Sequence, residues 1–234
     1  MAWRINKILD VGMDLNQFLF NIIPYIAEGI PVTLQLTIFS FTLGLALGII
    51  LAAMRIFAIA PISGIARAYI EFFRGTPLLV QLFFIYFGLP SIGIKLDAFT
   101  ASVLAIGLNS AAYQAEILRS AIKGIPEEQF LSAESLGMSI SEMYRFIILP
   151  QAIRIATPAL VNEFVALVKY TSLASIIGVA ELLRKTEYMV AYTFSPEIYL
   201  VAAIFYLAIC LPSSQISKIL EHKYAIPGYK RTLV

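Results

Sequence analysis

Cysteine, histidine and charged side chains are all scarce in this chain of 234 residues. The single cysteine, Cys210, lies inside an apolar run, which excludes a disulfide framework and a thiolate metal site. The single histidine, His222, lies in a charged C-terminal segment, so a multi-histidine metal centre is excluded as well. The phosphate-binding pattern G-x-x-x-x-G-K-[ST] does not occur. We therefore expect no metal or cofactor on this chain and no ATP hydrolysis by that route.

The composition points to a lipid environment. Charged residues make up 14% of the chain and hydrophobic residues 59%, with a mean hydropathy of +0.83. A soluble domain of this size with such a composition would have to expose large apolar patches to water. The net charge of +2 is small and the basic residues are scattered, which excludes a nucleic-acid-binding surface. The sequence predicts an all-α integral membrane protein in a lipid bilayer.

Five segments are long and apolar enough to span a bilayer, which requires about 20 residues of helix. A sixth segment, residues 169–192, is too short in its apolar part and is expected to be a short or re-entrant piece. The five expected spans are residues 29–54, 75–94, 98–118, 151–168 and 198–217.

The distribution of lysine and arginine predicts the orientation of these spans. Five spans place the two termini on opposite sides, and basic residues favour the cytoplasmic side. With the C-terminus inside, six of the 17 basic residues lie outside: Arg4, Lys7, Lys95, Lys169, Arg184 and Lys185. We therefore expect the N-terminus outside. Residues 1–28 are expected to form an interfacial lead-in and not a cleaved signal peptide. The transmembrane domain is expected at 29–222 and a cytoplasmic tail at 223–234.

A charged, amphipathic insert at residues 124–150 separates the third and fourth expected spans. Pro126 and the two acidic residues that follow it are typical of a helix start. Gly137 predicts a break, and Ser139 with Glu142 three residues later predicts the start of a second short helix. The insert, called the elbow below, is the long polar segment expected on the cytoplasmic side.

The elbow resembles the cytoplasmic coupling loop of permease subunits of ATP-binding-cassette (ABC) importers, whose pattern is E-A-A-x-x-x-G-x9-I-x-L-P. The chain departs from it at Leu131, where the family usually has Glu, and at Ser132, where it has Ala. The candidate ATPase-coupling residues are Leu131, Ser132, Ala133, Gly137, Ile147, Leu149 and Pro150.

Four further stretches resemble the polar amino-acid branch of these permeases, the histidine, glutamine and arginine type. They are residues 71–90, 109–126, 168–182 and 193–207. The resemblance implies a type I importer permease in a prokaryotic cytoplasmic membrane, working with a second identical or different permease. It further implies two partner ATPase subunits that bind ATP and magnesium, and an extracytoplasmic binding protein that delivers a polar amino acid.

Polar side chains within the spans are the candidate substrate ligands, because a charge there costs about 2.5–3.5 kcal/mol and usually faces a cavity or a partner. An amino acid needs an acceptor for its ammonium group and donors for its carboxylate. Glu163 could accept the ammonium; it could equally pair with a basic residue of a neighbouring helix. The candidate substrate-binding residues are Glu163, Asn162, Asn109, Ser110, Tyr113, Thr171 and Ser172.

Other polar and small residues have structural interpretations. Glu116 and Arg119 are expected to pair with each other at the cytoplasmic end of their helix. Gly75 and Pro77 should break the second span beside Arg74, either as part of a gate or as a packing kink. In the stretch 169–173 the family often has Lys-Asp-Thr-Ser-Leu, and this chain has Tyr170 in place of the acid.

Two other classes of protein remain as alternatives. An ion-coupled secondary transporter or channel acting alone would need no second subunit and usually contains repeats, which this sequence does not show. A membrane enzyme would need a nucleophile with a base or a metal cluster, and neither is visible. The transmembrane subunit of an ABC importer is the function that the sequence favours.

Overall fold

The computed structural model describes residues 18–223, and these form helices joined by short turns, without a strand. Residues 1–17 of the expected lead-in and residues 224–234 of the expected tail lie outside the described part. The elements are η1 (Phe18–Ile22), α3 (Ile23–Ala27), α4 (Ile30–Phe57), α5 (Ala60–Gly75), α6 (Leu78–Phe83), η2 (Phe84–Gly88), η3 (Leu89–Ile92), α7 (Ala98–Lys123), α8 (Glu127–Ser135), α9 (Ile140–Met143), η4 (Tyr144–Ile148), α10 (Leu149–Tyr170), η5 (Thr171–Ile177), α11 (Leu182–Thr193), η6 (Pro196–Ile198) and α12 (Tyr199–Lys223).

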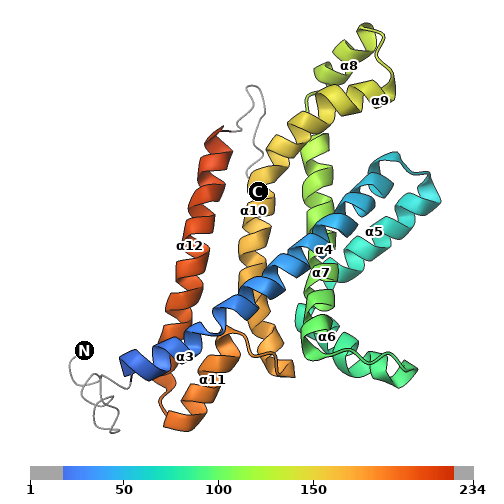
Figure 1. Cartoon of the computed structure of the whole chain (residues 1–234). Helices are drawn as coiled ribbons and strands as arrows, with labels where there is room; N and C mark the ends of the chain where they lie inside the picture. The colour runs from blue at the N-terminus through green and yellow to red at the C-terminus, as the bar shows by residue number, and fades with distance from the viewer. Residues whose placement is uncertain (1–17, 224–234) are drawn as a thin grey trace.

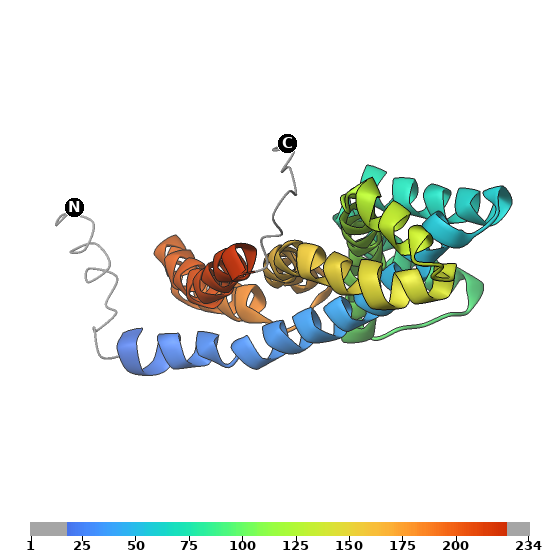
Figure 2. The ribbon, with the colours of Figure 1, turned by 90° about the horizontal axis from the view of Figure 1, so that it is seen from above.

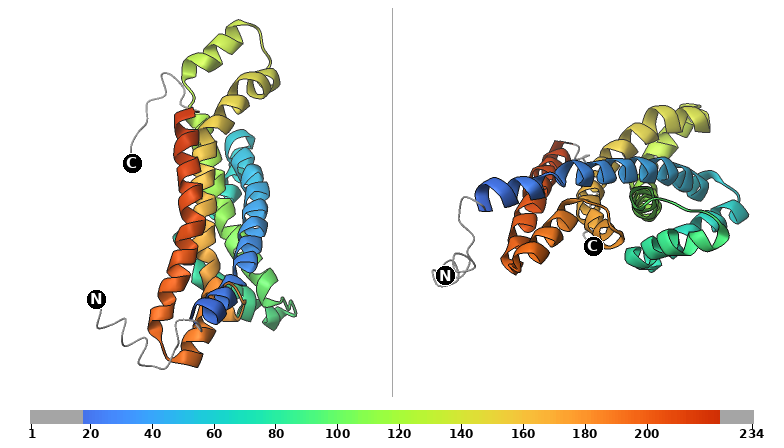
Figure 3. Two further views of the ribbon diagram at one scale, coloured as in Figure 1. Left: turned by 60° about the vertical axis from the view of Figure 1, so that its left-hand side comes forward. Right: turned by 60° about the horizontal axis from the view of Figure 1, so that its bottom comes forward.

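The long helices run between two distinct ends of the molecule (Figure 1). The elbow helices α8 and α9 lie at one end, and α3 and α11 lie at the other. Helices α7, α10 and α12 connect the two ends, and α4 crosses them at an angle, as the view from above shows (Figure 2). Turned about the vertical axis, the long helices form a column with the elbow projecting beyond it (Figure 3).

Three helical stretches of the described residues are long and apolar enough to cross a membrane, and a fourth forms if the bent pair α5 and α6–η3 counts as one. Helix α7 does not qualify by composition, although its 26 residues are sufficient in length. It buries four polar side chains against its neighbours: Ser102, Asn109, Ser110 and Gln114. A helix enclosed by other helices needs less apolar surface than one facing lipid, so α7 and the bent pair bring the possible spans among the described residues to five, although the second covers 60–92 where the sequence predicts 75–94.

The second expected span is broken, and the straight helix expected at 75–94 does not form. Residues 60–75 and 78–92 form two helical pieces bent by 105° with respect to each other. Thr76 and Pro77 between them have extended backbone conformations. Proline removes a backbone donor and disfavours a helical residue before it, which explains why the helix ends here.

Helices α4 and α7 pack closely through the small residues of the sequence GLALG. A Cβ atom on Gly44 would lie 2.7 Å from Gln114 Nε2, and one on Gly48 would lie 3.0 Å from Gln114 Cβ. These glycines let the two helices approach each other within this chain. The close approach places the polar side chains of α7 directly beside the backbone of α4.

The elbow has the two-helix form that its sequence predicts. Helix α8 follows Pro126, and Gly137 adopts a left-handed conformation with φ of 73°. Helix α9 begins with a capping box, in which the Ser139 hydroxyl accepts from the Glu142 N–H while the Glu142 carboxylate accepts from the Ser139 N–H. Local capping and turn residues therefore set where the two elbow helices begin and break.

The expected short piece at 169–192 is a 3-10 turn, η5, followed by helix α11. Glu181 caps α11 by accepting hydrogen bonds from the N–H groups of Leu183 and Arg184. The Tyr206 hydroxyl of α12 donates a 2.6 Å hydrogen bond to the same carboxylate, which is fully buried. Burial raises the pKa of Glu181 above its usual range. This acid fastens α11 to the last helix.

Candidate functional site

The Ser110 and Glu163 side chains meet at mid-depth between the two ends of the molecule. Ser110 lies 13 residues before the end of α7 at Lys123, and Glu163 lies 14 residues after the start of α10 at Leu149. At 1.5 Å per residue, both positions are about 20 Å from the elbow end of their helices. The hydrocarbon core of a bilayer is about 30 Å thick, so a position about 20 Å from the elbow end of a span lies inside it.

A chain of hydrogen bonds holds Glu163 in place. The Ser110 hydroxyl donates to Glu163 Oε1 over 2.7 Å. Gln114 Nε2 donates to Ser110 Oγ over 2.9 Å and to the Phe41 carbonyl oxygen of α4 over 3.3 Å. Because Ser110 accepts from Gln114, its single proton is directed to the carboxylate. Three helices thus fix one carboxylate oxygen.

The second carboxylate oxygen of Glu163 has no hydrogen-bond donor in the described part of the chain, and no basic residue there lies within ion-pair distance of it. The alternative interpretation, a structural ion pair with a neighbouring helix, therefore finds no partner among residues 18–223. A half-buried carboxylate with one free oxygen is suited to an incoming cation.

Asn109 holds the broken helix against α7. Its Nδ2 donates to the Phe73 carbonyl oxygen over 2.9 Å and to Gln81 Oε1 over 3.1 Å. Gln81 Nε2 in turn donates to the Phe73 carbonyl and to Thr76 Oγ1. The break leaves carbonyl groups without helical donors, and the two amides satisfy them. Both N–H groups of Asn109 are engaged in this way, next to the predicted site.

The remaining predicted ligands are distributed along α7 and α10. Tyr113 lies one turn from Ser110 and lines a cavity between the end of α5, α7 and α10. Asn162 precedes Glu163 but is exposed on another face of α10. The Thr171 and Ser172 hydroxyls donate to backbone carbonyls three residues earlier, those of Val168 and Lys169, each over 2.7 Å. These two side chains terminate α10 locally.

Two glutamines that organise the site were not among the sequence-based candidates. Gln114 is four residues after Ser110, on the same helix face, within a run of small residues. Gln81 is the uncharged polar residue in the apolar stretch that follows Pro77. A buried amide in an apolar helix must find hydrogen-bond partners, and this signal could have identified both.

The predicted coupling residues divide into buried and exposed sets. Ala133 is fully buried against Ile125, Met143 and Ile148 in the core of the elbow. Leu131, at 54% exposure, points away from that core. Three other large apolar residues of the elbow are exposed as well: Leu136, Ile140 and Phe146.

Comparison with known proteins identifies the family to which this chain belongs. The profile of the family described as "Binding-protein-dependent transport system inner membrane component" matches residues 44–226. The probable amino-acid ABC transporter permease protein YckA of Bacillus subtilis (strain 168) is 43% identical over 203 residues, covering 86% of this chain and 90% of the relative. This chain belongs to the family of amino-acid ABC transporter permeases.

Two further comparisons agree with this family. The glutamine transport system permease protein GlnP of Escherichia coli (strain K12) is 39% identical over 207 residues, covering 87% of this permease and 94% of the relative. The crystal structure of an amino acid ABC transporter with histidines superposes with a TM-score of 0.82 at 40% identity, covering 86% of this permease and 94% of that chain. The permease is a multi-pass membrane protein and a transmembrane subunit of an amino-acid ABC importer.

Proposed function

We propose that this permease transports a polar amino acid whose ammonium group binds Glu163. The observation that carries the proposal is the free oxygen of this mid-depth carboxylate, whose other oxygen is fixed by Ser110. A cation that enters the site would replace the water lost by the carboxylate, and the charge-assisted hydrogen bond would be strong in a dry environment. The hydroxyl of Tyr113 is available on the same side of α7 for the rest of the substrate.

The elbow is the docking surface for an ATPase subunit under this proposal. It projects beyond the helical column (Figure 3) and presents the exposed apolar side chains of Leu131, Leu136, Ile140 and Phe146. Exposed apolar patches of this kind mark protein interfaces. Two permeases, each with one ATPase subunit, would form the complete importer, with ATP and magnesium held by the ATPase subunits.

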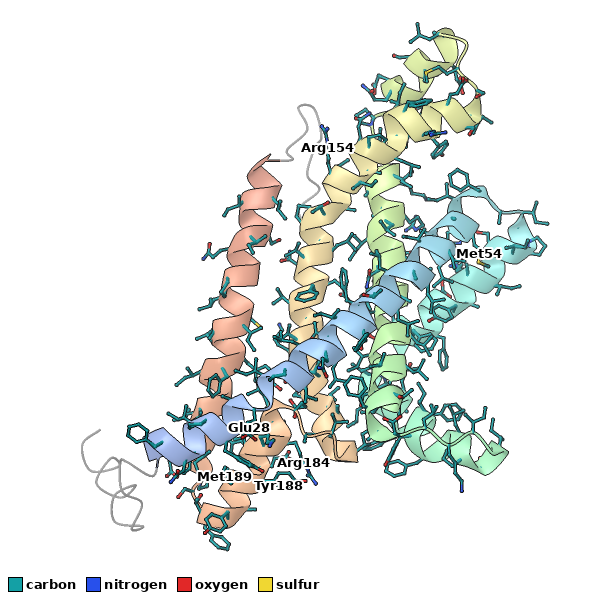
Figure 4. All side chains as sticks on the ribbon, viewed as in Figure 1. Glu28, Met54, Arg154, Arg184, Tyr188 and Met189 are labelled. Carbon is teal, nitrogen blue, oxygen red and sulfur yellow. The ribbon has the colours of Figure 1, made fainter. Side chains whose placement is uncertain are left out.

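The opposite end of the molecule would receive the binding protein. Glu28, Arg184, Tyr188 and Met189 gather there around α3 and α11, far from Arg154 at the elbow end (Figure 4). Lys185 donates a 2.8 Å hydrogen bond to Glu28, which raises the pKa of Lys185. With the elbow in the cytoplasm, this end is extracytoplasmic, the N-terminus is outside and the C-terminus is inside.

The transport cycle then has two states. Closure of the ATPase subunits on ATP would push the elbows and rock the long helices between an inward-open and an outward-open arrangement. The break at Thr76 and Pro77, attached to α7 through Asn109, gives a point about which the second span can move.

The proposal is tested with the permease, its ATPase and its binding protein reconstituted in proteoliposomes. Uptake of L-glutamine, L-histidine and L-arginine is measured with and without ATP, for wild-type and Glu163→Gln protein. We expect ATP-dependent uptake of one or more of these amino acids, and loss of substrate-stimulated ATPase activity and uptake in Glu163→Gln while the complex stays assembled. Wild-type uptake with unchanged apparent affinity in Glu163→Gln would exclude the ligand role.

A further inference from the structure

The segment η5 covers the Ser110–Glu163 pair on the side away from the elbow. It begins eight residues after Glu163, which corresponds to about 12 Å along the axis of α10. Ala174 of η5 is buried in one apolar cluster with Ala101 and Ala105 of α7, and residues of α4, α6 and η2 complete the cluster. Both alanines of α7 precede Ser110, so they lie farther from the elbow than the pair does. The seven residues of η5, called the plug below, therefore lie between the pair and the end of the molecule that holds α11.

A cavity lies on the elbow side of this hydrogen-bonded pair. It has a volume of about 360 Å³, and it is lined by Tyr113 and Ala159, each about one turn from the pair toward the elbow. The predicted ion pair of Glu116 and Arg119 forms at its wall, where Arg119 Nε and Nη2 donate to the carboxylate over 2.9 and 2.6 Å. The hydrogen-bonded pair thus has space on the elbow side and a packed plug on the other side. Cargo that comes from the α11 end must pass the plug.

The position of the plug depends on helix α11. The plug has the 3-10 conformation, whose hydrogen bonds are less favourable than those of an α-helix and whose runs are seldom this long. Gly178 follows it with a left-handed backbone, at φ of 93°, and α11 begins four residues later at Leu182. The plug is a less stable segment of backbone between two α-helices, so it stays in place when α11 stays in place.

Two other helices hold the first residues of α11. The Tyr206 hydroxyl of α12 donates to Glu181 Oε2 over 2.6 Å, and the Leu182 N–H donates to Thr33 Oγ1 of α4 over 3.2 Å. Glu181, Leu182 and Thr33 are all fully buried. A Cβ atom on Gly29 would lie 2.7 Å from Leu182 Cα, so the start of α4 directly contacts the start of α11. Helices α4 and α12 therefore both act on the N-terminal end of α11.

The hydrogen bond from Tyr206 can be lost without unfolding α11. Among the described residues, the other donors to the Glu181 carboxylate are the N–H groups of Leu183 and Arg184, both within α11 itself. No basic side chain in residues 18–223 lies within ion-pair distance of Glu181. Without the tyrosine hydroxyl the acid still caps α11, and α11 loses this bond to α12. A bond of this kind is suited to a joint that opens and closes in each transport cycle.

We infer that Glu181 and Tyr206 form a latch that keeps the plug closed over the Ser110–Glu163 pair. They are positioning residues of transport, because they act through the plug and not on the cargo. Rocking of the long helices would separate α12 from α4, break this bond and free α11 to carry the plug out of the cargo path. The inference rests on the proposed function for the orientation of the permease and for its two-state cycle, and it does not depend on Glu163 as a ligand.

The experiment measures how fast a membrane-impermeant thiol reagent, added from outside, labels a cysteine in the plug. The native Cys210 is replaced by serine, Ala174→Cys supplies the reporter, and the permease is expressed with its ATPase in right-side-out membrane vesicles without ATP. Tyr192→Cys and Leu136→Cys report the orientation, because these positions are 81% and 77% exposed at the two ends of the molecule. We expect fast labelling of Tyr192→Cys, no labelling of Leu136→Cys and slow labelling of the reporter.

Variants of the latch should expose the reporter. Tyr206→Phe keeps the ring and removes the hydroxyl, and we expect labelling about tenfold faster, because loss of a hydrogen bond to a carboxylate raises the population of the open form by about that factor. Glu181→Ala should have the same effect. Thr33→Val, which keeps the shape and removes the acceptor on α4, is the second, independent variant and should also increase the rate.

Two further variants separate the latch from a general loss of stability. Glu181→Gln should label slowly, because the amide can still bond the Tyr206 oxygen in either orientation. Tyr69→Phe is the matched control, since it removes a hydroxyl bond of 2.9 Å to the Leu108 carbonyl between α5 and α7, away from the latch, and it should label slowly. Rates are compared at equal amounts of assembled complex, measured by co-purification of the ATPase.

The failure of the latch and that of the proposed function give different results. Slow labelling of the reporter in assembled Tyr206→Phe and Thr33→Val complexes would overturn the latch, and so would equally fast labelling in Tyr69→Phe. Labelling of Leu136→Cys from outside, with Tyr192→Cys protected, would instead contradict the proposed orientation and with it the extracytoplasmic position of the plug. Glu163→Gln should label as slowly as the wild type, so its uptake tests the ligand role alone.

Discussion

The hydroxyl of Ser110 donates a hydrogen bond of 2.7 Å to the carboxylate of Glu163, across 53 positions of sequence and between two different helices. Gln114 donates to the same hydroxyl, so the serine proton has one direction to take. The carboxylate is therefore held in a single orientation by one of its two oxygens. Replacing Ser110 is therefore the most direct test of whether the orientation of the Glu163 carboxylate matters for substrate binding.

We predict that Ser110→Ala lowers the affinity for substrate without preventing assembly. A hydrogen bond to a charged group contributes about 1.5–3 kcal/mol, which corresponds to at least a tenfold rise in the apparent KM for uptake. Thr42→Ala is the control, because the Thr42 hydroxyl bonds only to the Ile38 carbonyl of its own helix among the described residues. An unchanged KM in Ser110→Ala would show that the serine does not orient the acid.

Gly44→Val should disturb the same site from the side of α4. Its Cβ would lie 2.7 Å from Gln114 Nε2 and 3.1 Å from Ser110 Cβ, so the helices must separate or Gln114 must move. Overpacking of this kind costs about 1–3 kcal/mol, and we expect a lower thermal midpoint together with impaired uptake. Gly64→Ala on α5, with no atom within 4 Å of its Cβ position, should be neutral or slightly stabilising. A normal midpoint in Gly44→Val would contradict the close packing.

The elbow was predictable because its signals are local. Pro126, Gly137 and the pair Ser139 and Glu142 determine two helix starts and one break within about 20 residues, and each acts through its own backbone. Most of the spans were predictable for an equally simple reason, the thickness of the bilayer, whereas the second expected span is bent by 105°. In these parts of the chain, the interactions that determine the structure are between residues close together in the sequence.

The site was only partly predictable because its contacts are long-range. Glu163 and Ser110 stood out as polar residues within apolar segments, but spacing along one helix cannot show which residue of another helix it meets. Asn109 illustrates the difficulty, because its partners are a carbonyl freed by Pro77 and the amide of Gln81, 28 positions away. The sequence indicated the break and Asn109 separately, and only the packing of α5 and α6 against α7 joins them.

Gly137→Val should uncouple ATP hydrolysis from uptake. Gly137 has a left-handed backbone, and no atom lies within 4 Å of its Cβ position, so the expected cost of about 1–3 kcal/mol is backbone strain and not a clash. The break between α8 and α9 would then shift, and the elbow would meet the ATPase in a different orientation. Gly137→Asn is the matched control, since asparagine tolerates this conformation. Normal coupling ratios of ATP hydrolysed to substrate imported in Gly137→Val would contradict a coupling role.

Leu131→Glu tests the apolar character of the elbow surface. Leu131 is exposed and lies close in sequence to Leu136, so an added charge would have to be desolvated on docking. We expect weaker binding of the ATPase subunit, or unchanged binding if the added carboxylate remains hydrated in the complex. Binding is measured by co-purification at increasing salt concentration. Leu131→Met keeps the apolar contact and should bind normally. A gain in ATPase coupling with Leu131→Glu would instead reveal an unused basic partner on the ATPase subunit.

Glu181 should make the stability of the permease depend on pH. Its folded-state pKa is raised by burial above the value of about 4.3 expected in an unfolded chain, so the folded protein binds a proton over that interval that the unfolded chain has released. The contribution of Glu181 to stability is therefore fully present below the unfolded pKa and is lost as the pH rises through the folded one. In Glu181→Gln, which keeps an acceptor for the Arg184 N–H but does not titrate, this part of the slope should disappear from a series of thermal midpoints measured between pH 4 and pH 8. Glu28→Gln, which removes an acid that accepts from Lys185 at the same end of the molecule, is the control and should retain the decrease. An identical slope in wild-type and Glu181→Gln protein would show that the buried acid does not govern how α11 is fastened to α12.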